Sequence, residues 1–353
     1  MKLADLLQRH LSAFDQAYGD RCSAAMRQAI HAILRCRTEA SGHSRWQCTH
    51  CPHQQNYPLS CGHRSCPQCQ HQTTSQWLAR QQAKLLPVDY FMVTLTLPFE
   101  LRTLAWHHQA LVYPAMFRVA ASLLKDFAAT SPRLGTDIGF TAVLHTHSRA
   151  LDYHPHLHVV VPGGGYDPRR RQWRKNRGRY LFNGAALAKV WRARLLAALR
   201  HDAGLSLPSA LPTKWVVDCR RVGRGLPALQ YLSRYLYRGV VPEPAILGEA
   251  DGQVTFRYRD SRSGQTRTRT LPAVQFLWQV LQHVLPKGFH RSRDYGFLRG
   301  NALSLLRRIQ LLLHLTLPPM DATAPLRAEP LCPCCHHPMR RTGIHPARSP
   351  TSC

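Results

Sequence analysis

Long apolar runs are what this 353-residue sequence most clearly lacks. No stretch of about 18 consecutive apolar residues occurs, so the sequence offers no candidate for a transmembrane helix. The first residues also lack the basic, apolar and small-residue order of a secretory signal peptide. We therefore expect no membrane partner and a location in the cytoplasm.

Acidic side chains are the second scarcity. Asp and Glu together number 19 against 47 Lys and Arg, which gives a formal net charge of +28. So large an excess is more than solubility requires and favours a polyanionic partner such as nucleic acid. A merely basic, ribosome-like protein is the alternative, whereas a DNA-binding protein would be associated with the nucleoid.

A phosphate-binding loop of the ATPase type is also missing. Gly163, Gly164 and Gly165 follow an apolar run but lack the GxxxxGK[ST] pattern that cradles a nucleoside triphosphate. The sequence therefore gives no support to a helicase or to another activity driven by a nucleoside triphosphate. No internal repeat is detectable, and the length predicts roughly two domains.

Cysteine, by contrast, is abundant. Of the 12 cysteines, seven precede residue 70 and three lie between residues 332 and 335. In a reducing compartment, clustered thiols bind metal more often than they form disulfides. Two Cys-x-x-Cys pairs separated by a short loop predict a structural zinc ribbon in which four thiolates hold one ion. The predicted ligands are Cys48, Cys51, Cys66 and Cys69.

Further donors near these pairs leave alternatives open. Four of them are expected to be solvated loop residues, although one could replace a cysteine or a second ion could bind: His50, His53, Cys61 and His63. Cys22 and Cys36 are expected to be core or free thiols. The C-terminal Cys332, Cys334 and Cys335 form half of a zinc knuckle with no second pair after them, so this tail either binds zinc or is loose.

A histidine motif lies near the middle of the chain. The letters YHPHLH begin at Tyr153 and are followed by three valines and by Pro-Gly-Gly-Gly, which predicts a buried strand with a sharp exit. Residues two apart on a strand share a face, so His156 and His158 should point one way while Leu157 points into a core. Two imidazoles about 6 to 7 Å apart can converge on one divalent cation. The alternative is a strand with incidental surface histidines.

Apolar patterns around this motif predict the order strand, helix, strand, strand, helix, strand, helix. This order resembles a ferredoxin-like, split βαβ layout of the α+β class, in which an antiparallel sheet has the histidine strand at its centre. The predicted strands span residues 90–98, 138–147, 153–161 and 214–219, and the predicted helices span 104–127, 184–200 and 226–237. Outside this core we expect helices at 3–37, 77–86, 271–285 and 302–315, a hairpin at 254–271, a basic turn at 286–296 and a linker at 318–330.

Three tyrosines fall on the helix predicted at 226–237. Tyr231 and Tyr235 are four residues apart and should share a face, whereas Tyr237 should lie off that face as a core or interface aromatic. A tyrosine can cleave a phosphodiester when it lies in line with the phosphorus and the phosphate charge is compensated. Arg234 lies between the pair and is a candidate DNA-binding residue.

A basic segment with two aromatics separates the histidine strand from the next helix. Basic side chains bind phosphates and aromatic rings stack on unpaired bases, so the pattern is typical of contact with single-stranded DNA. A solvated charged loop is the alternative. The candidate DNA-binding residues in this predicted loop, which ends at Tyr180, are Arg169, Arg170, Arg171, Trp173, Arg174, Lys175 and Arg177.

Taken in order, these motifs resemble one family over nearly the whole chain, from about residue 10 to 340. The cysteine module, the YHPHLH strand with its Pro-Gly-Gly exit, the stretch from Tyr231 to Tyr235 and the 286–296 turn resemble the transposases of rolling-circle insertion-sequence family ninety-one and the related common-region elements. The resemblance implies an HUH endonuclease core that nicks one DNA strand at the element's terminus. It further implies a 5′-phosphotyrosine link, a free 3′-hydroxyl and movement of single-stranded DNA to a target site.

Two kinds of metal follow from this reading. Structural Zn²⁺ would occupy the cysteine site, and Mg²⁺ or Mn²⁺ at His156 and His158 would compensate charge on the phosphate. The motif does not identify the third ligand of the second metal. His145, on the neighbouring predicted strand, is preferred, and His154 and Gln230 are the alternatives.

The expected organisation has three segments. Residues 1–86 would form a helical and zinc-ribbon DNA-binding domain, 87–316 the tyrosine nuclease domain, and 317–353 a linker with a Cys/His tail. Besides transposition, two other functions fit the residues. One is a rolling-circle replication initiator or relaxase, and the other is a non-catalytic, zinc-dependent DNA-binding protein.

Overall fold

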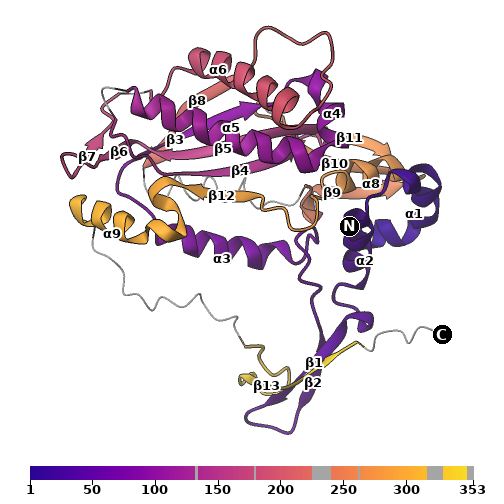
Figure 1. Cartoon of the computed structure of the whole chain (residues 1–353). Coiled ribbons are helices and arrows are strands. Elements are labelled where there is room, and N and C mark those ends of the chain that lie inside the picture. Colours follow the sequence, from indigo (N-terminus) through magenta and orange to yellow (C-terminus); the bar gives the residue numbers. More distant parts are fainter. Residues whose placement is uncertain (132–133, 179, 225–239, 261–262, 316–328, 348–353) are drawn as a thin grey trace. The chain divides into compact units, whose positions relative to one another are not determined.

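Figure 1 shows a computed structural model of the whole chain, in which residues 1–131, 134–178, 180–224, 240–260, 263–315 and 329–347 are described, without the side chains of 70–75. The chain forms two compact units. The terminal unit comprises Met1–Trp77, Tyr237–Val284 and Met320–Cys353, and the sheet unit comprises Leu78–Leu236 and Leu285–Pro319. This division differs from the predicted boundaries. The segment Tyr237–Val284 belongs to the same unit as both ends of the chain, whereas the sequence predicted it as part of the nuclease domain.

A five-stranded antiparallel sheet is the framework of the sheet unit. The histidine strand is its middle strand, in agreement with the predicted layout. Residues 156–160 of this strand are paired on both edges, so their side chains have cross-strand neighbours on two sides. The strands lie in the order β12 (Ser292–Tyr295), β4 (Phe140–His147), β5 (Tyr153–Pro162), β3 (Asp89–Thr96) and β8 (Val217–Arg224).

One face of this sheet is apolar and covered by helices. Leu157, Val159 and Val161 alternate along β5 and are fully buried, which confirms that Leu157 points into a core. The other strands contribute the same alternation, and the face packs on the apolar sides of the helices. Figure 1 shows these helices along one side of the sheet: α4 (Arg102–His107), α5 (Gln109–Ala129) and α6 (Gly184–Ala197).

The opposite face of the sheet is more polar and bears the histidines. Near its edge, Asp294 of β12 accepts a hydrogen bond from Thr141 Oγ1 at 2.6 Å and pairs with Lys84 Nζ at 2.5 Å. Lys84 follows α3 (Gln70–Gln82), so this carboxylate joins the end of that helix to the sheet. Helix α9 (Leu303–Leu312) is joined to the residues after α3 by Gln310, whose Nε2 donates to the carbonyl of Ala83 at 3.0 Å.

Two segments predicted as a loop and a turn contain strands instead. In the basic segment, β7 (Gln172–Lys175) pairs with β6 (Gly164–Asp167) as a hairpin. Its turn is closed by Asp167, whose Oδ1 accepts from two successive backbone N–H groups at 3.1 Å each. In the 286–296 segment, β12 pairs with β4 through backbone hydrogen bonds. Both strands are polar, and pairing along an available edge requires no apolar alternation that a sequence pattern could reveal.

In the terminal unit, the N-terminal helices pack on a segment more than 200 residues away in sequence. Tyr18 stacks on Trp278 with ring centroids 4.6 Å apart, and His10 Nε2 lies 2.5 Å from Glu249 Oε1. The predicted hairpin at 254–271 is present and gains a third strand. The elements are α1 (Leu3–Tyr18), α2 (Ala24–Arg35), β9 (Ile246–Ala250), β10 (Gln253–Arg259), β11 (Thr266–Pro272) and α8 (Ala273–Leu281).

The same unit contains a three-stranded ribbon that joins the two ends of the chain. Its strands lie in the order β13 (Met339–Pro346), β1 (Gly42–Cys48) and β2 (Gln54–Pro58), all antiparallel. Of the two alternatives for the C-terminal tail, the loose one is therefore wrong for residues 339–346, which form a paired strand. The free edge of β1 supplies backbone hydrogen-bonding groups for β13, a pairing that no local pattern in a polar tail can indicate.

Two predicted elements lie outside the described residues: the tyrosine helix at 226–237 and most of the linker at 318–330. Among the helices that the structure describes, none combines the length and apolar character needed to cross a bilayer.

Candidate metal centre

Three histidines converge on the polar face of the central sheet. His145 of β4 lies directly opposite His156 of β5 in the strand register, and His158 follows two residues later on the same strand. The ligand nitrogens of these three side chains all lie within 4.8 Å of one another. His145 was the preferred third ligand in the sequence, and the structure places it beside the other two.

Hydrogen bonds orient two of the rings. His156 Nδ1 lies 2.7 Å from the carbonyl oxygen of His154, and His158 Nδ1 lies 3.1 Å from Thr94 Oγ1. With each Nδ1 occupied in this way, the Nε2 atoms of His156 and His158 face each other at 3.1 Å. In metal sites a hydrogen bond to one ring nitrogen sets the tautomer and directs the other nitrogen to the ion.

His145 has a ring nitrogen that forms no hydrogen bond with the described residues. Its Nε2 is buried and has no hydrogen-bond partner among the described residues. A buried polar atom without a partner costs about 1–3 kcal/mol, which a metal–nitrogen bond would offset. This atom is the observation that best fits a divalent ion at the three histidines.

Burial keeps all three imidazoles neutral. It lowers the pKa of His156 to about 4 and lowers the pKa values of His145 and His158 well below the usual histidine range. The neighbouring histidines act in the same direction, His158 on His145 and His156 on His158, followed by the positive charges of Arg291 and Arg220 respectively. Neutral imidazoles have free lone pairs for a metal, and the nearby arginines favour an anionic substrate.

The alternative third ligands do not join this cluster. His154 Nδ1 lies 2.5 Å from a guanidinium nitrogen of Arg102, and His154 is absent from the group of converging nitrogens. Gln230 lies outside the described residues. Of the three candidates, the structure therefore places only His145 among the converging nitrogens within the described part of the chain.

The predicted single cysteine site is wrong, because its four members divide between two clusters. Cys48 and Cys51 gather with Cys332 and Cys335, while Cys66 and Cys69 gather with Cys36 and Cys61. In the second cluster, Cys69 Sγ lies 3.5 Å from Cys36 Sγ and 3.6 Å from Cys61 Sγ. Each predicted Cys-x-x-Cys pair is thus joined by two other cysteines. These were expected from the sequence to be core, loop or tail residues.

The sequence positions of these additional cysteines gave some indication that they could be ligands. Cys36 follows directly after α2 and Cys61 lies five residues before Cys66, so both are near the pairs in sequence. Cys332 and Cys335 also have the two-residue spacing of a half-site. What the sequence could not indicate was which half-sites meet, because that depends on the pairing of β13 with β1.

The predicted DNA-binding residues occupy the β6–β7 hairpin in different ways. Arg169, Arg170 and Arg171 are exposed at its turn, and Lys175 and Arg177 are exposed beyond it. Trp173 instead packs within the protein, against Phe297 at a centroid distance of 5.9 Å and over Gly164, where a Cβ would meet the indole at 2.5 Å. Tyr180, the other aromatic residue of this segment, is 76% exposed.

The predicted catalytic tyrosines, Tyr231 and Tyr235, lie outside the described residues, as does Arg234. The nearest described residue before them is Arg224, at the end of β8. Tyr231 follows it by seven residues.

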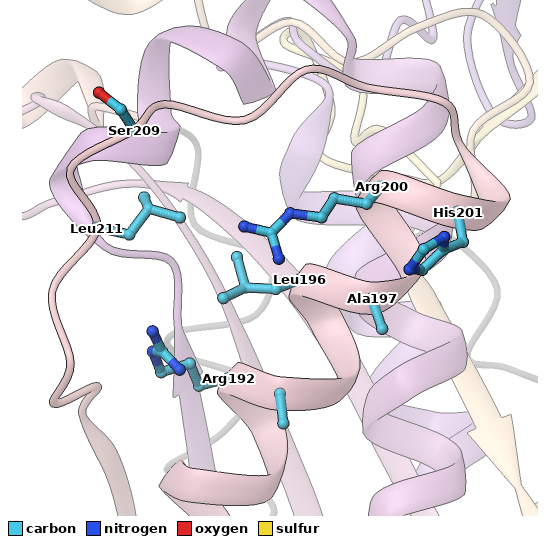
Figure 2. Close-up of a pocket in the computed structure, with 8 residues that line it drawn as sticks. Arg192, Leu196, Ala197, Arg200, His201, Ser209 and Leu211 are labelled. Atoms are coloured by element: carbon cyan, nitrogen blue, oxygen red, sulfur yellow. The ribbon is translucent and has the colours of Figure 1, made fainter.

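A cavity of about 300 Å³ lies on the other side of the sheet unit (Figure 2). It is formed by α6, the turn after it and the segment that returns toward β8. Because α6 covers the apolar face of the sheet, this cavity is separated from the histidines by the sheet itself. Its lining includes Arg192, Leu196, Arg200, His201, Ser209 and Leu211.

Two family models match this chain. Residues 139–304, which include the three histidines, match a family described as "Putative transposase". Residues 6–97, which include six of the eight clustered cysteines, match a family described as the transposase zinc-binding domain. A zinc-binding domain therefore precedes the histidine sheet in the chain.

Relatives of known name agree with these matches. The chain is 35% identical over 371 residues to "Putative transposase y4qJ" of Sinorhizobium fredii (strain NBRC 101917 / NGR234), covering 95% of this chain and 93% of the relative. It is 28% identical over 290 residues to the transposase for insertion sequence element IS801 of Pseudomonas savastanoi pv. phaseolicola, covering 77% and 70% of the two chains.

Among solved structures, the relaxase TrwC in complex with a 27-mer DNA is similar over 64% of this chain and 75% of its own, with 16% identity. The TM-score is 0.26, which does not establish a common fold.

Proposed function

Because the chain belongs to the transposases of rolling-circle insertion-sequence family ninety-one, we propose that it nicks and rejoins single-stranded DNA at the ends of its element through a phosphotyrosine intermediate. The observation that carries this proposal is the convergence of His145, His156 and His158 on the polar face of the sheet. Three neutral, buried imidazoles with an unpartnered nitrogen are suited to a metal-dependent reaction at a phosphate.

The three histidines would hold a divalent ion, Mg²⁺ or Mn²⁺, which when bound polarises the scissile phosphate and offsets charge on its non-bridging oxygens. The protein's own contribution is to hold these ligands rigidly. His156 and His158 lie on the central strand of the sheet, and Thr94 and the carbonyl of His154 fix their ring orientations. Positive charge from Arg220 and Arg291 draws the DNA phosphate toward the same face.

Tyr231 and Tyr235 would supply the nucleophile. In the nicking step, the phenolic oxygen bonds to phosphorus, the bond from phosphorus to the 3′ oxygen breaks, and the phenolic proton is transferred to that leaving oxygen. The products are a 5′-phosphotyrosine and a free 3′-hydroxyl. Attack of a 3′-hydroxyl on the phosphotyrosine reverses the bond changes, so rejoining consumes no nucleoside triphosphate.

DNA binding would rest on the basic hairpin and on Tyr180. The exposed arginines at the turn can pair with phosphates, and the exposed phenol ring can stack on an unpaired base. The zinc of the zinc-binding domain would be held by the cluster of Cys36, Cys61, Cys66 and Cys69, whose sulfur spacing suits a tetrahedral ion. A protein with this substrate would work in the cytoplasm at the nucleoid.

The decisive experiment is a covalent-adduct assay. A labelled single-stranded oligonucleotide carrying the element's terminus is incubated with the full chain and Mn²⁺, and the adduct is separated under denaturing conditions. We expect an adduct with the native chain and none with the double variant Tyr231→Phe, Tyr235→Phe. His156→Ala should reduce adduct formation by at least about a hundredfold while DNA binding remains, because the ligand acts on the reacting phosphate.

Matched controls exist for both kinds of residue. Tyr237→Phe should retain the adduct, since this ring is expected off the shared tyrosine face. His147→Gln should also retain it, because His147 lies two residues from His145 on the same strand but outside the converging group. An adduct mapped by mass spectrometry to Tyr237 or to a serine would contradict the tyrosine assignment. Full adduct formation by His156→Ala would show that the histidines are structural, and DNA binding with no adduct from the native chain would favour a non-catalytic protein.

A further inference from the structure

Four cysteines from the two ends of the chain meet at one end of the three-stranded ribbon. Cys48 is the last residue of β1 and Cys51 lies in the following turn, whereas Cys332 and Cys335 precede β13. The Sγ atom of Cys48 lies 3.4 Å from that of Cys335, and the Sγ atom of Cys51 lies 3.6 Å from those of Cys332 and Cys335. The two halves of this cluster are separated by more than 280 residues of sequence.

The sulfur spacing is that of a metal site and not of a disulfide. A disulfide would place two sulfurs about 2.05 Å apart. Four thiolates around one Zn²⁺, each at about 2.3 Å, lie about 3.8 Å from one another in a tetrahedron. The observed separations of 3.4–3.6 Å lie close to the second value.

The backbone around Cys48 prepares its sulfur to carry negative charge. The N–H groups of His50 and Cys51 point at Cys48 Sγ, with nitrogen–sulfur distances of 3.3 and 3.4 Å. This wrapping of a loop around a thiolate is what a zinc knuckle requires.

Packing alone offers little to hold β13 in place. Apart from Met339, none of its eight residues is buried. The apolar cluster at this end of the ribbon consists of Cys48, Cys332 and Met339, with Trp46, Cys51 and Cys335 partly buried against it. A core this small stabilises a fold by only a few kcal/mol, and modules of this size commonly depend on a metal.

We propose that Cys48, Cys51, Cys332 and Cys335 hold a structural Zn²⁺ of their own, and that this ion fastens the C-terminal strand β13 to β1. The two C-terminal ligands lie outside the matched zinc-binding domain of residues 6–97, so that domain is completed by residues 329–347. The second ion, at Cys36, Cys61, Cys66 and Cys69, needs no part of the C-terminal segment. During synthesis the cluster of Cys48, Cys51, Cys332 and Cys335 can therefore close only after residues 332–335 have been made.

Zinc content of the full chain tests this proposal without any measurement of DNA cleavage. The native protein should contain about two zinc ions per chain, and Cys332→Ser should retain about one, because only one cluster loses a ligand. Cys334→Ser is the matched control. Cys334 is exposed and lies outside the cluster, so its replacement should leave the zinc content unchanged.

Hydrogen exchange and ligand replacement separate loss of the ion from general misfolding. In Cys332→Ser, amides of β13 and of the facing edge of β1 should exchange faster while the protection of β3, β4 and β5 is unchanged. Cys332→His should restore the zinc content. When Co²⁺ replaces zinc, the absorption spectrum of this cluster should be that of four sulfur ligands in the native protein and that of three sulfurs and one nitrogen in Cys332→His.

A native zinc content of one, or an unchanged content in Cys332→Ser, would overturn the proposal. So would a Cys332→His protein whose Co²⁺ spectrum is identical to that of the native chain. The nicking assay can fail with zinc content as expected, or the reverse, so the two proposals are tested separately.

Discussion

At the residue scale, the histidine cluster depends on one hydroxyl for the orientation of His158. Thr94 of β3 faces His158 across the sheet, and its Oγ1 lies 3.1 Å from His158 Nδ1. Thr96, two residues further along, faces His156, but its hydroxyl donates to the carbonyl of Val216 at 2.8 Å. Two threonines of β3 are thus paired with two histidines of β5, but of the two hydroxyl groups the one of Thr94 is hydrogen-bonded to an imidazole and the one of Thr96 to a backbone carbonyl.

This difference gives a prediction with an internal control. Thr94→Val preserves the shape of the side chain but removes the hydroxyl, so we expect Mn²⁺ affinity to fall about 10- to 100-fold, as for other partners of metal-binding histidines. Isothermal titration with Mn²⁺ measures the affinity. Thr96→Val should leave it nearly unchanged, and equal effects of the two substitutions would mean that the His158 contact does not orient a ligand.

At the element scale, the β6–β7 hairpin presents its arginines without needing them for its own structure. Asp167 closes the turn through the backbone N–H groups of Arg169 and Arg170, and Arg171 has a positive φ of 52°. Substitution of these three arginine side chains should therefore change the structure of the hairpin little.

Removal of these charges should weaken DNA binding and its dependence on salt. The neutral variant carries Ala at positions 169 and 170 and Gly at position 171, because glycine accepts the positive φ of Arg171. If all three contact phosphates, the slope of log affinity against log salt should fall by up to about 2, at roughly 0.7 per phosphate contact on single strands. Fluorescence anisotropy over a series of salt concentrations measures the slope. The triple Lys variant keeps the charge and should keep the slope, whereas an unchanged slope in the neutral variant would exclude the hairpin from the DNA interface.

At the scale of the whole molecule, the sheet unit and the cysteine ribbon depend on different forces. The sheet unit has a large apolar core, with Leu157, Val159 and Val161 against α5 and α6, whereas the cysteine ribbon has almost none. Metal removal should therefore affect the ribbon far more than the sheet.

We expect a strong zinc chelator to unfold the ribbon and leave the sheet folded. Amides of β1, β2 and β13 should lose protection from hydrogen exchange, while those of β3, β4 and β5 should keep it. Mass spectrometry of peptides from the chelated full chain measures both at once, and addition of Zn²⁺ should restore the ribbon. Simultaneous loss of protection in β5 would contradict independent stabilisation of the ribbon and the sheet.

The sequence by itself determined the features that depend on local periodicity and on short-range spacing. The alternation through β5 was sufficient to place His156 and His158 on one face and Leu157 in the core, because successive side chains of a strand point to opposite faces. The central position of that strand and the helices over its apolar face followed from the order of apolar segments. The family was also recognisable from its ordered motifs.

Only the tertiary structure decided which distant residues meet. His145 joins the other histidines because the β4–β5 register places it opposite His156, a relation that sequence distance does not specify. The polar strand β12 is stabilised by backbone hydrogen bonds to β4, and such bonds leave no mark in side-chain pattern. The cysteine half-sites have several pairings that are chemically equal. The choice among them depends on β13 pairing with the edge of β1, a contact that spans nearly the full length of the chain.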